Sequence, residues 1–192
     1  MDSYLKNSVM TPYHDVISLV SLLAGKITHI GLGCTMSTSY YPPFLLARIL
    51  AIMDHLSRGR IAWNVVTSFN PAEAKNFGLE KPLPHDERYE RAEEYMDLVY
   101  QLWDAWEPDA VIEDRENGIM IDPSKVRHIN FSGKYFKCRG PLNVSLSPRT
   151  SVIAQAGASP RGIKFAVKHA EVIFALKSSI DDMKKLYDEV KT

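Results

Sequence analysis

The sequence predicts an α/β fold with a parallel sheet of the (β/α)-barrel type, in which four strands make about half of an eight-stranded barrel. Short apolar runs alternate with segments of helical periodicity, and this is the pattern of strands joined by crossover helices. The run Ile61–Val66 is too continuously apolar for a strand with one solvent face, and such strands belong to parallel sheets. Because a complete barrel typically needs about 250 residues, a chain of 192 residues suits part of one.

Each element follows from local signals. Pro12 and the pair Pro42–Pro43 precede runs with apolar residues at helical spacing, because proline is tolerated in the first turn of a helix. One stripe of the longest expected helix is wholly apolar or aromatic. The expected strands are Ile27–Cys34, Ile61–Val66, Val152–Ala156 and Glu171–Leu176, and the helices cover about Tyr13–Leu23, the segment after Pro42, Asp86–Trp103, Pro160–His169 and Ile180–Lys191.

The pattern is interrupted over about residues 107–150, which are rich in Pro, Gly, Asp and Asn. Within them, Ile129–Phe131 and Tyr135–Cys138 flank the turn sequence Ser132-Gly133-Lys134 and are expected to pair as a β-hairpin. We therefore expect a single partial barrel domain over residues 1–192 with an inserted loop and hairpin region.

Composition excludes several classes of function. The 23 basic and 23 acidic side chains cancel, so no electrostatic footprint for nucleic acid or an anionic membrane is present. The apolar run Val16–Ala24 is far shorter than the roughly 20 residues that a bilayer requires. Met1–Lys6 does not resemble a signal peptide, and two cysteines make a disulfide framework improbable. These features favour a soluble protein of the cytoplasm, a reducing compartment.

Polar side chains gather where the expected strands end and the helices begin, which is where parallel α/β folds bind ligands. Thr35 and Ser68 follow two neighbouring strands, at positions expected to be equivalent. His85 and Tyr89 are four residues apart on a helix and therefore face the same way. Ser159 stands at a helix start after a glycine, where backbone N–H groups favour phosphate.

Each of these residues also has an ordinary structural interpretation. Ser159 can simply cap its helix, a contact worth about 1 kcal/mol. His85 can cap its own helix while Tyr89 packs beneath it, and the hydroxyls of Thr35 and Ser68 can bind the loops that follow them. From the local sequence alone these interpretations are at least as good as ligand binding.

Several longer motifs decide between them by their order and spacing. Together they resemble the flavin-dependent monooxygenases of the bacterial-luciferase superfamily, in the branch with nitrilotriacetate, dibenzothiophene-sulfone and long-chain alkane monooxygenases. The motifs are GLGCTMSTSY at 31–40, DHLSRGRIAWNVVTS at 54–68, NFG at 76–78, HDERYERAEEY at 85–95, LWDAWE at 102–107, DPSKVRHINFSGKYF at 122–136, GPLNV at 140–144 and QAGAS at 155–159.

The resemblance implies a (β/α)8 barrel that binds FMN at the carboxyl ends of its strands and uses O2 to oxygenate a small organic or xenobiotic substrate. It implies that a separate NAD(P)H-dependent flavin reductase supplies reduced FMN. The family's flavin contacts match Thr35, His85, Tyr89 and Ser159, with Ser159 at the phosphate; Ser68 is added from its position at a strand end. No metal site is expected.

The match covers less than half of a family member's length. The family's first two strands and everything after the sixth have no counterpart here, and the proton-handling residues belong to those parts, so no catalytic residue is assigned. An alternative function is therefore a truncated, non-catalytic flavin-binding or assembly module. A half barrel also leaves an open sheet face, from which we expect a homo-oligomer.

Overall fold

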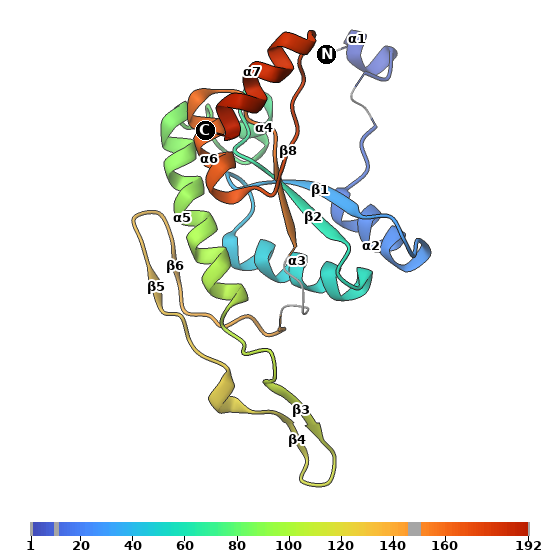
Figure 1. The fold of residues 1–192 in the computed structure, drawn as a ribbon, viewed down its shortest axis with the longest axis vertical. Coiled ribbons are helices and arrows are strands. Elements are labelled where there is room, and N and C mark those ends of the chain that lie inside the picture. The colour runs from blue at the N-terminus through green and yellow to red at the C-terminus, as the bar shows by residue number, and fades with distance from the viewer. Residues whose placement is uncertain (1, 10–11, 146–150, 192) are drawn as a thin grey trace.

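The computed structural model describes residues 2–9, 12–145 and 151–191, and its centre is one parallel sheet (Figure 1). The strands lie in the order β1-β2-β7-β8, and every neighbouring pair is parallel. The predicted α/β fold is thereby confirmed. The bounds are β1 (Leu32–Ser37), β2 (Ile61–Val66), β7 (Val152–Gln155) and β8 (Val172–Ile173).

Helices occupy the connections between these strands, as crossover units of a parallel sheet require. The segment Ile61–Val66 and the helices after Pro42 and Pro160 agree closely with the sequence prediction, whereas α1 and α4 were not predicted. The helices are α1 (Asp2–Lys6), α2 (Val16–Lys26), α3 (Pro43–Ser57), α4 (Pro71–Asn76), α5 (His85–Trp103), α6 (Pro160–His169) and α7 (Ile180–Lys191), with a short 3-10 helix η1 (Pro123–Lys125).

The core lies between the sheet and the helices that pack on one of its faces. Trp63 of β2 is fully buried there, and its indole N–H donates to the Met36 carbonyl at 3.0 Å. The predicted stripe of α5 is buried along its whole length, from Tyr89 to Trp103. In β1 and β2, however, alternate residues are exposed or half-buried, so β2 is not covered on both faces as its apolar sequence suggested.

The first strand begins at Leu32 and not at Ile27, as the sequence suggested. The guanidinium of Arg60 explains the difference, because it donates to the carbonyls of Ala24, Ile27 and Ile30 at 2.6–3.1 Å. These contacts satisfy the backbone of a loop between α2 and β1 that would otherwise need a strand partner. The strand consequently extends further than predicted, to Ser37.

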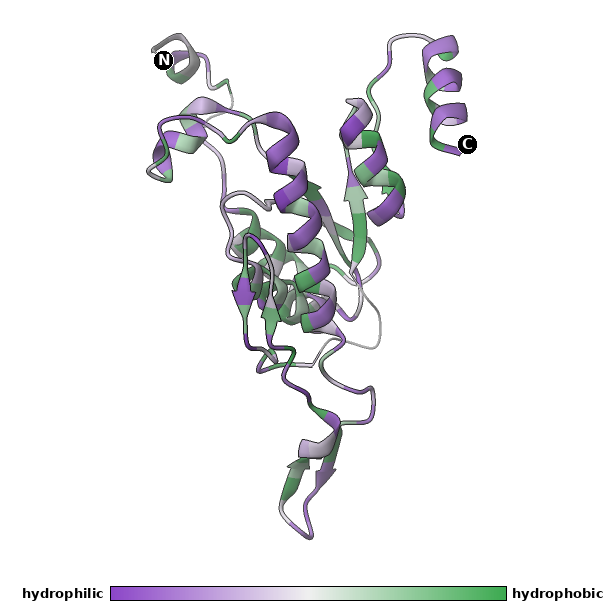
Figure 2. Cartoon of the chain, turned by 90° about the vertical axis from the view of Figure 1, so that its left-hand side faces the viewer, coloured by the Kyte–Doolittle hydropathy of each residue, from purple (hydrophilic) through white to green (hydrophobic). Residues whose placement is uncertain are grey.

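Two hairpins lie in the predicted insertion, of which residues 146–150 are outside the described part. One is β5 (Phe131–Ser132) with β6 (Lys137–Cys138), shorter than expected but paired in the expected order. The other, β3 (Val111–Asp114) with β4 (Ile119–Ile121), was not predicted. Figure 2 shows it extending away from the sheet with apolar residues along its strands.

The last strand is also shorter than the predicted Glu171–Leu176. β8 is at the edge of the sheet and its partner β7 ends at Gln155, so backbone pairing stops once the Phe174 amide has bonded to the Gln155 carbonyl. Beyond it Leu176 is 84% exposed. Cys34 and Cys138 are free thiols, as expected. Among the described residues, no helix combines the length and the hydropathy needed to cross a bilayer.

Candidate functional site

A cavity of about 490 Å³ lies at the carboxyl end of the sheet, a size typical of small-molecule sites. Three of the five predicted site residues, Thr35, Ser68 and Tyr89, contribute to its wall. The lining residues are Thr35, Val66, Thr67, Ser68, Phe69, Asn70, Glu73, Tyr89, Gln155, Ala156 and Gly157. The loop after β2 and helix α4 provide five of them, Thr67, Ser68, Phe69, Asn70 and Glu73, of which only Ser68 was predicted as a site residue.

The other two predicted residues meet at the start of α6. The hydroxyl of Ser159 caps this helix by accepting the Gly162 N–H at 3.0 Å, and it lies 3.1 Å from Nε2 of His85. Nδ1 of His85 lies 2.7 Å from the Asp86 carboxylate, which favours a proton on that nitrogen. In neutral His85, Nε2 then accepts the Ser159 O–H; in the imidazolium form, it donates instead.

His85 does not cap its own helix, which was one of the two structural interpretations. The residue before α5 is Pro84, which has no side-chain donor or acceptor, and the imidazole reaches across to α6. Ser159 is a helix cap, so its ordinary interpretation holds; the same hydroxyl nevertheless faces His85 from another element. The structure thus brings two residues 74 positions apart into hydrogen-bond distance.

Tyr89 is 6% exposed and lies between two other rings. Its ring centroid is 5.1 Å from that of His85 and 5.7 Å from that of Phe165, in tilted and edge-on geometries that aromatic pairs prefer. These neighbours hold the phenol in place with its hydroxyl directed at the first turn of α6. The side chain therefore packs and presents a polar atom at the same time.

Two glycines make room around this hydroxyl. A Cβ at Gly162 would lie 2.7 Å from the Tyr89 oxygen and 3.1 Å from the Ser159 oxygen. A Cβ at Gly157 would lie 2.9 Å from the same Tyr89 oxygen and 2.6 Å from the Gln155 amide nitrogen. Both distances to the phenol are shorter than real Cβ contacts, so only glycine keeps this polar cluster open at either position.

The predicted equivalence of Thr35 and Ser68 is wrong. Thr35 is paired in register with Asn64, whose amide donates to the Thr35 hydroxyl at 3.0 Å. Ser68 lies beyond β2 with φ of 50°, and its hydroxyl donates to that of Ser37 at 2.9 Å. The cause is the later start of β1, which moves Thr35 from the end of the strand to its middle; both residues still line the cavity.

Two polar residues near the cavity, Gln155 and Asn64, were not among the predicted site residues. Gln155 is 4% exposed and accepts the Gly157 N–H at 2.5 Å, so it shapes the turn before α6. Its position at the end of a predicted strand was the available signal. Among the described residues, the Oδ1 atom of Asn64 is buried without a hydrogen-bond partner, although its amide nitrogen is bonded. An acceptor left open in this way is unusual in a folded protein.

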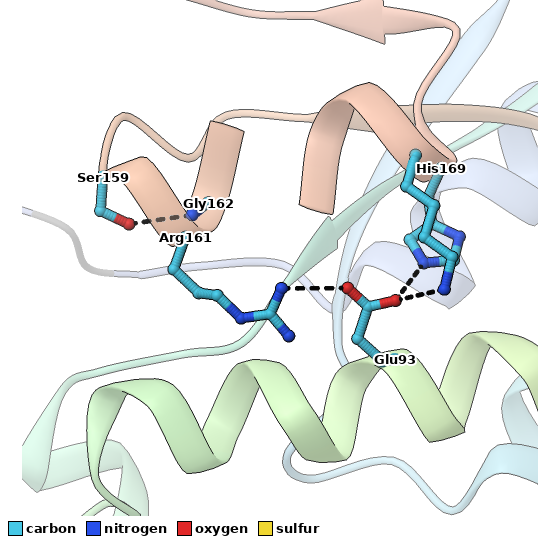
Figure 3. Close-up of polar contacts among 6 residues, drawn as sticks. Glu93, Ser159, Arg161, Gly162 and His169 are labelled. Carbon is cyan, nitrogen blue, oxygen red and sulfur yellow. Dashed lines mark hydrogen bonds and ion pairs between the residues drawn. The ribbon is translucent and has the colours of Figure 1, made fainter. Parts of the chain in front are cut away.

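Basic residues at both ends of α6 are paired with Glu93 of α5. Its carboxylate accepts from Lys168 Nζ at 2.6 Å, from His169 Nε2 at 2.9 Å and from Arg161 Nη1 at 3.3 Å (Figure 3). Burial opposes ionisation of Glu93, but the hydrogen bonds from Lys168 and His169 outweigh it and lower the pKa of the carboxyl. Among the described residues, no group of three or more His, Cys, Asp or Glu could hold a metal ion.

The parallel sheet, its crossover helices and a cavity at the carboxyl end define a protein of the (β/α)-barrel type. The particular family follows from comparison with known proteins. The model of the luciferase-like monooxygenase family matches residues 1–192, and the chain belongs to that family. The resemblance in the sequence motifs is thereby confirmed.

Individual relatives agree with this assignment. The chain is 46% identical over 175 residues to dibenzothiophene-sulfone monooxygenase of Rhodococcus erythropolis, a match over 91% of this chain and 39% of that protein. The crystal structure of a long-chain alkane monooxygenase matches with a TM-score of 0.95 and 46% identity, over 99% of this chain and 44% of that one. The crystal structure of a riboflavin lyase with modified FMN and riboflavin matches with a TM-score of 0.94 and 38% identity, over 100% of this chain and 43% of that one. The chain thus spans less than half the length of these relatives.

Proposed function

We propose that the chain is the flavin-phosphate-binding part of a two-component monooxygenase that uses reduced FMN and O2. The observation that carries the proposal is the convergence of the Ser159 hydroxyl, the His85 imidazole and the Tyr89 phenol at the start of α6, beside the Gly162 amide that Ser159 caps. Hydroxyl, imidazole and phenol can all donate to phosphate, and a helix start adds a favourable dipole.

The residues present fit FMN in three respects. Gly157 and Gly162 leave a space that a methyl group would fill, next to donors from two helices. The adjoining cavity has apolar walls, including Val66 and Phe69, that suit a flavin ring. Asn64 supports the cavity residue Thr35 from β2, because its amide donates to the Thr35 hydroxyl at 3.0 Å.

Bound reduced FMN would supply the electrons with which O2 is activated for transfer of one oxygen atom to an organic substrate. The residues of this chain would hold the phosphate through Ser159, Tyr89 and His85, and would place the ring along the carboxyl end of β1 and β2. The side chains of Val66 and Phe69 would pack against the ring. Thr35 and Ser68 would contact the ring edge from the cavity wall.

The wider assignments rest on the family. We infer a separate NAD(P)H-dependent flavin reductase as functional partner, a small organic or xenobiotic substrate, a cytoplasmic location and self-association of the chain. The alternative of a non-catalytic flavin-binding or assembly module shares the same phosphate site. It differs in lacking turnover when reductase, NADH and substrates are supplied.

Removing two donors should abolish most of the FMN affinity. In a Tyr89→Phe, Ser159→Ala double variant we expect FMN to bind more weakly by about 100-fold or more, because each hydrogen bond to a charged group is worth roughly 1.5–3 kcal/mol. Flavin fluorescence or titration calorimetry measures the change, with riboflavin as the ligand that has no phosphate and whose affinity should hardly change.

A matched control removes the same atoms elsewhere. Tyr13 is 75% exposed and Ser21 lies in α2, so Tyr13→Phe, Ser21→Ala should leave both affinities unchanged. Unaltered FMN binding in the Tyr89 and Ser159 double variant would show that the phosphate is held elsewhere.

A further inference from the structure

Glu93 occupies an unusual place for a carboxylate, because it bonds to both ends of a neighbouring helix. Oε1 accepts from Arg161 in the first turn of α6, and Oε2 accepts from Lys168 and His169 in its last turn. Residues 161 and 168 are seven positions apart, which places them on one face of α6. Figure 3 shows the Glu93 carboxylate lying between the two groups.

The cluster around Glu93 is largely shielded from water. The side chain of Glu93 is 18% exposed and that of His169 only 2%. The second ring nitrogen of His169 lies 3.2 Å from the Tyr100 hydroxyl, and burial raises the pKa of that phenol to about 12, so the hydroxyl stays protonated and can donate to the imidazole. An ion pair in this environment is screened less than one at the surface, and its loss would leave His169 buried without its acceptor.

The position of α6 along α5 controls the proposed phosphate site. Tyr89 and Glu93 are four residues apart on one face of α5, while Ser159 and Gly162 belong to the start of α6. The phenol oxygen already lies so close to Gly162 that a Cβ there would be 2.7 Å away. A displacement of α6 by a fraction of an ångström would therefore either move Ser159 and Gly162 away from the Tyr89 phenol or bring them into a steric clash with it.

We propose that Glu93 is a positioning residue that fixes α6 against α5 and thereby holds Ser159 and the Gly162 amide in register with His85 and Tyr89. This inference rests on the proposed phosphate site. Glu93 does not touch that site itself; it acts through Arg161, Lys168 and His169. The role differs from simple stabilisation because its effect is confined to ligands that carry a phosphate.

The test is the substitution Glu93→Gln, which keeps the size of the side chain and removes its charge. We expect the affinity for FMN to fall about tenfold, the scale on which loss of a supporting contact weakens a ligand site, while the affinity for riboflavin is unchanged. Glu90→Gln is the matched control: Glu90 lies one turn earlier, its ion pair with Lys134 is 55% and 64% exposed, and both affinities should stay as in the parent chain.

Equal losses for FMN and riboflavin, or unchanged FMN binding at a lowered melting temperature, would overturn the positioning role. If Glu93→Gln fails to fold, Lys168→Met removes one donor that is 55% exposed, and it should still weaken FMN several-fold more than riboflavin. If the ratio of FMN affinity to riboflavin affinity is unchanged in that variant, the proposal is overturned as well.

Failure of the phosphate site itself gives a different result. A parent chain that binds FMN no better than riboflavin would contradict the proposed function but not the role of Glu93 in the register of α6. The nitrogen chemical shift of His85 Nε2 reads that register without flavin, because this atom of α5 lies 3.1 Å from the Ser159 hydroxyl of α6. The shift should change in Glu93→Gln, and an unchanged shift would contradict the register claim directly.

Discussion

Replacing Gly162 by alanine should destabilise the chain by about 1–3 kcal/mol, the usual cost of inserting a methyl group into a packed site. In most helices the same change stabilises by up to about 1 kcal/mol, so the expected sign is reversed. The new methyl would lie 2.7 Å from the Tyr89 oxygen and 3.1 Å from the Gly157 Cα. Because the phenol ring is held between His85 and Phe165, it cannot easily move aside. Denaturant unfolding measures the stability, and FMN affinity should fall with it.

Gly25 provides the matched control. It also lies in a helix, α2, but a Cβ there would meet nothing within 4 Å in the described part of the chain outside the helix's own backbone, so Gly25→Ala should stabilise or be neutral. Adding Tyr89→Phe to Gly162→Ala removes the atom that clashes and should recover part of the lost stability. A Gly162→Ala variant as stable as Gly25→Ala, with FMN binding intact, would show that the space at the start of α6 is not needed.

The open face of the sheet should make the chain self-associate at micromolar concentration. Val152 and Val172 are 37% and 50% exposed on that face, and Phe174 and Leu176 continue the apolar surface at 61% and 84%. At about 25 cal/mol per Å², a few hundred Å² of such surface is worth several kcal/mol, comparable with the stability of a domain. Sedimentation or light scattering across a dilution series, with binding of an apolar-surface dye, measures the association.

A charged residue on that face should weaken the association. Val172→Lys places a cation among the exposed apolar strand residues, whereas Val167→Lys alters a valine of similar exposure, 56%, on the outside of α6. Only the first should shift the chain toward monomer. A parent chain that remains monomeric, unfolds cooperatively and binds no dye would contradict the open-face argument.

The fold was predictable from the sequence where a residue's pattern and its environment agree. The continuous apolar run of β2 and the stripe from Tyr89 to Trp103 in α5 led to the correct elements. The start of β1 was not predictable, because Ile27 and Ile30 favour a strand locally while the side chain of Arg60, some 30 residues later, takes their carbonyls. The β3–β4 hairpin was missed since its strands are short and its residues are exposed, which leaves no burial pattern.

The candidate site also has features that the sequence predicted and features that it did not. Helical spacing alone placed His85 and Tyr89 on one face of α5, and the helix start placed Ser159 near a set of backbone donors. The contact between His85 and Ser159 joins two helices that are far apart in the sequence, and only the family motifs pointed to it. The sequence did not indicate the contacts of Glu93 with α6, because a glutamate among the acidic residues of α5 has the pattern of a solvated helix face.

The central claim is that the start of α6 receives the phosphate of FMN, and amide chemical shifts in a labelled chain test it most directly. On addition of FMN, the largest shifts should fall on the Gly162 amide and its neighbours in the first turn of α6, together with the ring nitrogens of His85. Riboflavin, which has no phosphate, should leave these signals in place. Binding of FMN with no shift at Gly162, or identical shifts with both ligands, would contradict the claim.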